Sequence, residues 1–118
     1  MKVLHVNEHL SRRGGVETYL FELLPELESR GITAPLAYAE GDASLHEPAR
    51  PVPELGTAGF RAEWRCRDRM ETLLEEEAPD LVHVHNVQNV GALQASLAYG
   101  PTVLTTHDCR WACPASSF

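Results

Sequence analysis

Short apolar runs that alternate with helical patterns constrain the fold of this chain more than any other feature of its sequence. The first run, KVLHVN at 2–7, is mostly apolar over its whole length, which is typical of a parallel strand buried on both faces. Similar runs predict further strands at 32–39, 80–86 and 101–108. Helical spacing of apolar residues predicts helices at 16–30, 60–77 and 87–100. We therefore expect an α/β fold, a Rossmann-like parallel sheet with helices on both faces.

Several details refine this pattern. Pro25 lies inside the first helix, and we expect a kink rather than a break, because the apolar spacing continues past it. Pro35 indicates that the second strand lies near an edge of the sheet. Residues 40–59 have no clear periodicity, apart from a short strand expected at 51–55. The apolar stripe of the second helix is expected to consist of Phe60, Trp64, Met70, Leu73 and Leu74.

Length and charge narrow the classes of protein. A chain of 118 residues is long enough for one domain with a buried core. Its net charge of −7 argues against a general nucleic-acid-binding protein, which is usually basic. No apolar run approaches the ~20 residues that span a bilayer, and the start MKVLHVNEHL is too polar for a secretory signal. We therefore expect a cytoplasmic protein whose three cysteines stay reduced.

A glycine pair follows the first predicted strand, in a loop over 8–14 that leads into the first helix. Ligands of parallel α/β sheets bind beyond the carboxyl ends of the strands, which is where this loop lies. Gly14 and Gly15 let a ligand approach the backbone N–H groups closely, and Arg12 and Arg13 add two cations. This pattern predicts a phosphate site. The alternative is a plain turn with solvated arginines, because neither a G-x-G-x-x-G fingerprint nor a P-loop pattern is present.

Two histidines lie in the third predicted strand. His83 and His85 share a face, since side chains alternate along a strand. His83 is interpreted as a hydrogen-bonded core residue, and His85, at the carboxyl end, as the one placed to meet a ligand. The alternative is a metal site, but no third ligand has convincing spacing. We therefore expect no metal here.

The segment THDCRWACP brings a further histidine to the end of the last predicted strand. His107, with Asp108 beside it, can donate a hydrogen bond to a sugar hydroxyl or accept a proton. The alternative is a histidine that caps the strand end. Cys109 and Cys113 could join His107 as metal ligands, but their spacing matches no zinc pattern. We expect them to be reduced, partly buried thiols.

A basic stripe marks the second predicted helix. Arg61, Arg65 and Arg69 recur every four residues beside an aromatic residue, Trp64, which suits anionic lipid head groups or a charged acceptor. The alternative is an ordinary solvated face, because acidic residues of the same helix dilute the positive charge.

Three segments together resemble a known family. MKVLHVNEHLSRRGGVETYLFELLPELESRG, then PDLVHVHN, then PTVLTTHD followed by CP, are similar to the N-terminal domain of family-four glycosyltransferases. These are retaining enzymes of the GT-B architecture, in which two Rossmann-like domains face a cleft. The resemblance covers most of the chain and is weakest across 40–59. It implies that 1–118 is one N-terminal, acceptor-side domain whose donor-binding C-terminal domain is missing.

The resemblance also implies roles for particular residues. Gly14 and Gly15 match the cleft loop near the donor diphosphate, and Arg12 and Arg13 flank it. His107 matches the active-site histidine that touches the transferred sugar, which makes it, with Asp108, the catalytic pair. His85, Asn86 and Glu17 match the acceptor side.

The implied activity is hexosyl transfer from a nucleotide-diphosphate sugar to a glycan or lipid-linked acceptor, with no metal ion and no nucleic acid. The family's polysaccharide biosynthesis and its docking at the inner face of the membrane suggest similar roles here. Because the donor domain is missing, we expect the chain to be a fragment or half of a split enzyme, and to transfer no sugar alone. The alternative is a non-catalytic binding module.

Overall fold

The computed structural model describes residues 1–12 and 14–105. Its strands are β1 (Val3–Val6), β2 (His9–Leu10), β3 (Leu36–Tyr38), β4 (Glu40–Gly41), β5 (Ala49–Pro51), β6 (Leu81–Val84) and β7 (Thr102–Leu104). Its α-helices are α1 (Gly15–Ser29), α2 (Phe60–Glu77) and α3 (Val90–Tyr99). Two short 3-10 turns, η1 (Ala43–Leu45) and η2 (Pro53–Gly56), flank β5.

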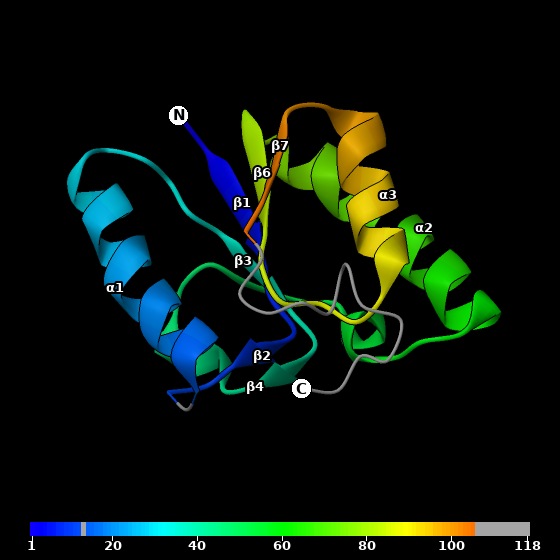
Figure 1. Ribbon diagram of the computed structural model, residues 1–118. Helices are drawn as coiled ribbons and strands as arrows, with labels where there is room; N and C mark the ends of the chain where they lie inside the picture. The colour runs from blue at the N-terminus through cyan, green and yellow to red at the C-terminus, as the bar shows by residue number, and fades with distance from the viewer. Residues whose placement is uncertain (13, 106–118) are drawn as a thin grey trace.

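Five of these strands form one parallel sheet in the order β5-β3-β1-β6-β7 (Figure 1). Counted along the chain, this is the order 3-2-1-4-5 of a doubly wound, Rossmann-like sheet. The register aligns His5 of β1 with Leu36 of β3 and with His83 of β6. The expected α/β fold with a parallel sheet is therefore confirmed. A second, two-stranded parallel sheet joins β2 to β4.

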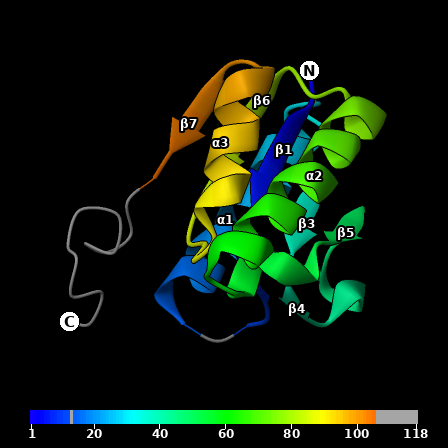
Figure 2. The same cartoon turned by 90° about the vertical axis from the view of Figure 1, so that its right-hand side faces the viewer.

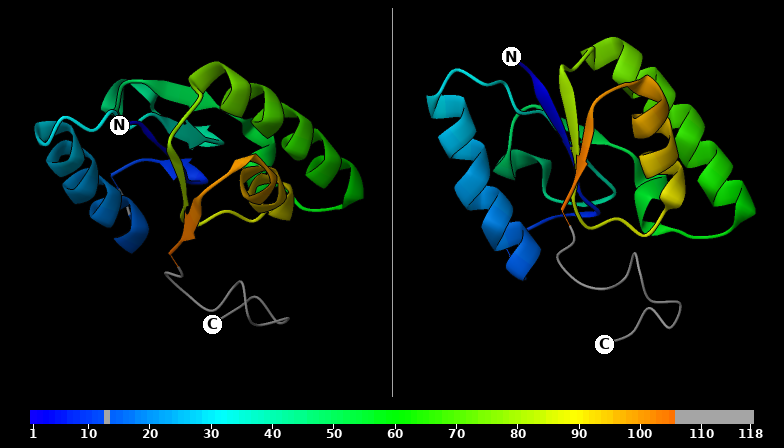
Figure 3. Two further views of the ribbon diagram at one scale, coloured as in Figure 1. Left: turned by 90° about the horizontal axis from the view of Figure 1, so that it is seen from above. Right: turned by 45° about the horizontal axis from the view of Figure 1, so that its top comes forward.

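The helices cover both faces of the sheet, as the view from above in Figure 3 shows. α1 lies on one face and α2 with α3 on the other. Alternation along each strand divides the buried side chains between two cores. Leu4, Val6 and Val84 face the α2–α3 side, whereas Leu36 packs with Leu20 and Leu24 of α1. Burial of these two apolar layers holds the parallel sheet together.

α2 and α3 run side by side across their face of the sheet (Figure 2). A Cβ built on Gly91 would lie 2.3 Å from the backbone oxygen of Glu63, so the contact between the helices requires a glycine. The side chain of Asn89 caps α3 by accepting a hydrogen bond from the Gly91 N–H at 2.8 Å. Asn89 also donates to the backbone oxygen of Glu54 at 3.1 Å, which fixes the start of α3 to η2.

The helix predictions agree closely with the structure. α1 continues through Pro25 and stops at Arg30 and Gly31, as expected. α2 has the predicted bounds, and α3 ends at the predicted Gly100 but begins at Val90, three residues later than predicted, because Asn89 caps it there.

The strand predictions need three corrections. The strand expected at 51–55 lies earlier, as β5, and η2 occupies its place, since Pro53 begins a turn there. The strand predicted at 32–39 is the shorter β3, which Pro35 precedes and which lies beside the edge strand β5, near an edge as predicted. The predicted strand at 101–108 is the shorter β7, and 106–108 lie outside the described residues.

The stripe predicted for α2 is wrong at two positions. Met70, Leu73 and Leu74 are buried, but the side chains of Phe60 and Trp64 are 85% and 68% exposed. At about 100° per residue, these two aromatics lie roughly a quarter to a third of a turn away from the centre of the buried stripe. Within the described part of the chain, no helix combines the length and apolarity needed to cross a membrane.

Candidate functional site at the carboxyl ends of β1 and β6

The order of the sheet reverses direction between β1 and β6. In open α/β sheets the connections leave on opposite faces at this point and open a crevice beyond the carboxyl ends of the two strands. The residues that follow β1 are Asn7 and Glu8, and those that follow β6 are His85 and Asn86. These two chain segments, nearly 80 residues apart in sequence, form the floor of the candidate site.

Asn7 ties the two segments together. Its side-chain oxygen accepts a hydrogen bond from the Asn86 N–H at 3.1 Å, and its amide donates to the His9 oxygen at 2.7 Å. The Glu8 N–H donates in turn to the Asn86 oxygen at 2.9 Å. Asn7 is 1% exposed, so these bonds satisfy a buried polar side chain. The floor of the site is consequently fixed by backbone and amide groups.

The glycine pair lies at the beginning of α1, the helix that follows β1 and β2 in the chain. Gly14 precedes the helix with φ of 88°, a left-handed conformation that favours glycine. Gly15 differs, because a Cβ built on it would meet no atom within 4 Å. The fold thus requires glycine at position 14, whereas at position 15 the missing side chain leaves open space. That space borders the first N–H groups of α1, which have no partners inside the helix.

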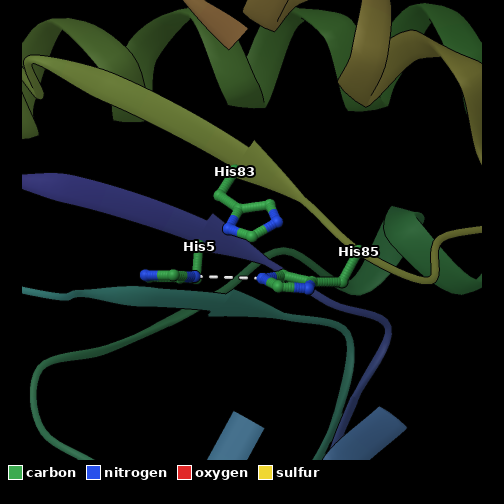
Figure 4. Close-up of side chains that lie close together, drawn as sticks. All are labelled: His5, His83 and His85. Atoms are coloured by element: carbon green, nitrogen blue, oxygen red, sulfur yellow. Dashed lines mark hydrogen bonds between the residues drawn. The ribbon is translucent and has the colours of Figure 1, made fainter. Parts of the chain in front are cut away.

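Three histidines, one from β1, one from β6 and one directly after β6, gather on the α1 face of the sheet (Figure 4). Nδ1 of His5 lies 3.0 Å from Nε2 of His85 in a hydrogen bond. The ring centroids of His83 and His85 are 3.9 Å apart, and His5 lies 5.3 Å from each. His5 and His85 are fully buried and His83 is half-buried. We call these three residues the histidine cluster.

The surroundings of the histidine cluster fix its rings and its charge. Nε2 of His83 lies 2.6 Å from the Thr105 hydroxyl, and the Tyr19 ring of α1 lies 6.0 Å from His85. Burial lowers the pKa of His5 to about 3, with smaller contributions from the charges of His83 and His46. His5 is therefore neutral at physiological pH.

A comparison with protein-family models matched residues 13–115 to Glycosyltransferase Family 4. This match covers more than half of the chain. The chain belongs to glycosyltransferase family 4. A comparison with curated proteins gave no match. The parallel sheet and its strand order agree with a Rossmann-like domain of such a glycosyltransferase.

Within this family 4 domain, one residue of the loop before α1 and one of its first turn have neighbours that the sequence did not indicate. The guanidinium of Arg12 lies 4.9 Å from the centroid of the Phe21 ring, in a cation–π contact with α1. Glu17 is 8% exposed and lies in the first turn of α1, where the helix dipole favours a negative charge. Its carboxylate borders Gly14. Arg13 lies outside the described residues.

Sequence reasoning found some of the site and missed the rest. His83 is hydrogen-bonded as expected, but His85 is fully buried against His5. His5 and Asn7 were not considered as site residues. The alternating HVN pattern at the end of the first strand was the available signal, because it places His5 and Asn7 on one face.

The remaining predicted residues divide into two groups. Those of the segment that follows β7, namely His107, Asp108, Cys109 and Cys113, lie outside the described residues. The basic stripe lies on the exposed side of α2, where Arg69 pairs with Glu54 at 2.5 Å. Arg61 and Arg65 line a shallow hollow of about 340 Å³ together with the exposed Phe60 and Trp64.

A larger hollow, of about 630 Å³, lies between β5 and α2 rather than beyond the ends of β1 and β6. Charges of both signs line it, and several are paired with each other. Arg50 at its rim forms ion pairs with Glu76 and Glu77, each at 2.6 Å. We do not place the functional site there, because the paired charges give the hollow no clear preference for one class of ligand.

Proposed function

We propose that this family 4 domain forms the acceptor-side half of a retaining glycosyltransferase. The complete enzyme would transfer a hexose from a nucleotide-diphosphate sugar to a glycan or lipid-linked acceptor. The observation that carries the proposal is the open space at Gly15, in the first turn of α1, which follows β1 and β2 in the chain. The family match supports sugar transfer as the chemistry.

The start of α1 suits the leaving group of such a reaction. Departure of a nucleoside diphosphate develops negative charge on phosphate oxygens. Fixed N–H groups at a helix N-terminus stabilise that charge without reorganising. Gly14 and Gly15 let the phosphates approach these groups, and Arg12 and Arg13 supply cations at the same loop. Binding of the diphosphate would require Arg12 to leave the Phe21 ring or to reach the phosphate beside it.

The sugar and the acceptor would meet the residues that follow the strands. In the proposal, His107 with Asp108 beside it hydrogen-bonds the transferred sugar and orients it for attack. Asn86 and Glu17 line the acceptor side. Because His85 is fully buried, it supports this side from beneath by holding the end of β6.

A donor-binding domain, fused or in a separate chain, would complete the site. Closure of two domains over the donor excludes water and limits its hydrolysis. We therefore propose that this chain alone transfers no sugar and that the transfer itself needs no metal ion. A non-catalytic binding module is the alternative function, and it differs in requiring no donor domain.

The exposed aromatics of α2 suggest where the domain meets a membrane. Phe60 and Trp64 are large, apolar and exposed, and Arg61 and Arg65 lie beside them. Aromatic rings next to cations suit the boundary between anionic head groups and acyl chains. We propose that this surface holds the domain at the inner face of a membrane, near lipid-linked acceptors.

Amide NMR spectra of the isotope-labelled chain, titrated with UDP-glucose and with GDP-mannose, test the proposal. We expect the largest shifts at Gly14, Gly15 and Val16, with weak affinity because the donor domain is not included. Gly15→Val should abolish these shifts by filling the open space. Gly100→Val is the matched control, because Gly100 also has no atom within 4 Å of a built Cβ and its φ of 169° suits any residue.

Two outcomes would count against the donor site. One is the absence of shifts at the start of α1 at millimolar nucleotide sugar. The other is a set of shifts that Gly15→Val leaves unchanged. Sugar transfer by the purified chain alone would separately contradict the need for a donor domain.

A further inference from the structure

The histidine cluster is the one group of chemically versatile side chains in the described structure that the proposed function leaves largely unused. We propose that His5, His83 and His85 bind a transition-metal ion of the Zn²⁺ type on the α1 face of the sheet. The inference goes beyond the proposed function, because it concerns a second ligand and makes no use of sugar nucleotides.

The distances between the ring nitrogens suit such an ion. One nitrogen from each ring lies within 4.8 Å of the others. Two imidazoles that bind one Zn²⁺ tetrahedrally at 2.0–2.1 Å place their nitrogens about 3.3 Å apart. Nδ1 of His5 and Nε2 of His85 are already 3.0 Å apart, close to this spacing. Rotation of the side chains, without movement of the strands, would bring the third nitrogen into place.

The backbone holds the ligands in register. His5 and His83 are direct partners in the β1–β6 ladder, and His85 follows on the same face two residues later. The sheet thus places three imidazoles next to one another before any ion binds (Figure 4). Such preorganisation lowers the entropic cost of forming the site.

The donor atoms select the class of metal. The cluster contains imidazole nitrogens and no carboxylate, which suits Zn²⁺, Ni²⁺ or Cu²⁺ and disfavours Mg²⁺ and Ca²⁺. Three protein ligands leave the fourth tetrahedral position to water or to an anion. His83, which is half-buried, is the member of the cluster next to which solvent can enter.

Binding requires a shift of one proton. In the hydrogen bond between His5 and His85, one of the two facing nitrogens carries a hydrogen. That hydrogen must move to the other nitrogen of the same ring, so that both facing nitrogens present lone pairs to the ion. No proton is released, because both rings stay neutral and only change tautomer.

The groups around the three histidines determine how tightly we expect the metal ion to bind. The Thr105 hydroxyl can accept a hydrogen bond from Nε2 of His83 and orient that ring. Nε2 of His5 has no hydrogen-bond partner among the described residues, and it would carry the N–H when Nδ1 binds the metal. The lack of such a partner lowers the metal affinity of a site about 10–100-fold. We therefore expect micromolar binding rather than the tight binding of structural zinc sites.

Titration of the full chain with Co²⁺ and Zn²⁺ tests the site. Isothermal titration calorimetry gives stoichiometry and affinity, and the visible spectrum of Co²⁺ reports tetrahedral geometry. We expect saturation at one ion per chain, with Zn²⁺ displacing Co²⁺. His83→Gln should weaken binding by at least about 10-fold, because a lost ligand costs no less than a lost outer partner. His9→Gln is the control, since His9 lies outside the cluster.

Three results would overturn the proposal. The first is no saturable binding by the folded wild-type chain, and the second is equal affinity in the His83→Gln and His9→Gln variants. The third is binding that survives His83→Gln but is lost in Cys109→Ser/Cys113→Ser, which would place the metal on the cysteine segment. Thermal unfolding of each variant verifies that it is folded. Failure here would leave the proposed sugar transfer intact, because no sugar nucleotide is used.

Discussion

The side-chain oxygen of Asn7 and the backbone N–H of Asn86 are joined by a hydrogen bond of 3.1 Å between the ends of β1 and β6. The two residues are 79 positions apart, and neither lies in a regular strand. Regular ladder bonds stop at the ends of the strands, so side chains must fix the geometry beyond them. The bond therefore extends the pairing of β1 and β6 into the crevice where the proposed substrates bind.

Asn7→Ala tests this connection. The change leaves the Asn86 N–H and the His9 oxygen without their partner, and we expect a loss of about 2–3 kcal/mol in the free energy of unfolding. Asn86→Ala is the matched control, because Asn86 contributes only backbone atoms to the bond, so it should cost far less. Urea unfolding followed by circular dichroism measures both. Equal losses in the two variants would contradict the role of the Asn7 side chain.

Gly91→Ala tests the approach of α3 to α2. A Cβ would lie 2.3 Å from the Glu63 backbone oxygen, and the helices must separate to admit it. We expect a loss of about 1–3 kcal/mol in the free energy of unfolding, as for other overpacked cores. Gly15→Ala offers the comparison, since a Cβ there meets nothing and should leave stability unchanged or slightly raised. If urea unfolding gives Gly91→Ala the same free energy of unfolding as the wild type, the contact between α2 and α3 accommodates the methyl group and the prediction is wrong.

These contacts show which parts of the fold and of the candidate site could be predicted from the sequence. Apolar runs and helical spacing predicted the α/β order, the bounds of α2 and the end of α3 at Gly100, because such patterns reflect burial of one element at a time. His5 escaped attention because its partners depend on which strands are neighbours. β1 and β6 adjoin in the sheet although β3 and β5 come between them in sequence.

Phe60 and Trp64 illustrate a different limit. Hydrophobicity alone assigned them to the buried stripe of α2, but their position around the helix axis leaves them outside the core. The two glycines before and at the start of α1 are a similar case, because the role of each depends on geometry that the sequence does not show. The sequence indicates that Gly14 and Gly15 begin a helix, yet only the structure distinguishes the left-handed backbone at Gly14 from the open space at Gly15.

Trp64→Ala tests the proposed membrane surface. We expect the variant to stop sedimenting with vesicles of phosphatidylglycerol and phosphatidylcholine, because the Trp64 ring supplies apolar area at the membrane interface. The stability should change by no more than about 0.5 kcal/mol, since the side chain is 68% exposed. Leu97→Ala on α3 is the control, being a similarly exposed apolar residue at 61%. Binding that persists in Trp64→Ala, or that is lost equally in Leu97→Ala, would argue against this surface.

His107→Ala tests the proposed catalytic role in the enzyme that contains both domains. We expect turnover to fall at least about 100-fold, in the range attributed to positioned proton-transfer and hydrogen-bonding groups. Unchanged thermal unfolding would show that the loss reflects chemistry rather than folding. Turnover equal to that of the wild type would remove His107 from the mechanism, whereas the donor site at α1 would remain open to test.

The buried His5 makes the stability of the domain depend on pH. Its pKa is about 3 in the folded chain and near 6.5 when exposed. Between these values the unfolded chain binds the extra proton, so stability falls as pH falls below about 6.5. Binding of one extra proton by the unfolded chain lowers the free energy of unfolding by about 1.4 kcal/mol per pH unit. This predicts a loss of roughly 2 kcal/mol in that free energy between pH 6.5 and 5. That window lies above the ordinary range of the carboxyl groups, so their titration contributes little to it.

Urea unfolding at several pH values in the presence of EDTA measures this dependence without bound metal. His5→Leu should flatten the slope, because the variant has no imidazole to protonate at this position. His9→Gln should retain it, since His9 lies at the surface with its side chain 45% exposed. His83 and His85 face His5 and stay in all three proteins, so the difference in slope between the wild type and His5→Leu is assigned to position 5. A slope that His5→Leu leaves unchanged would contradict a depressed pKa at His5.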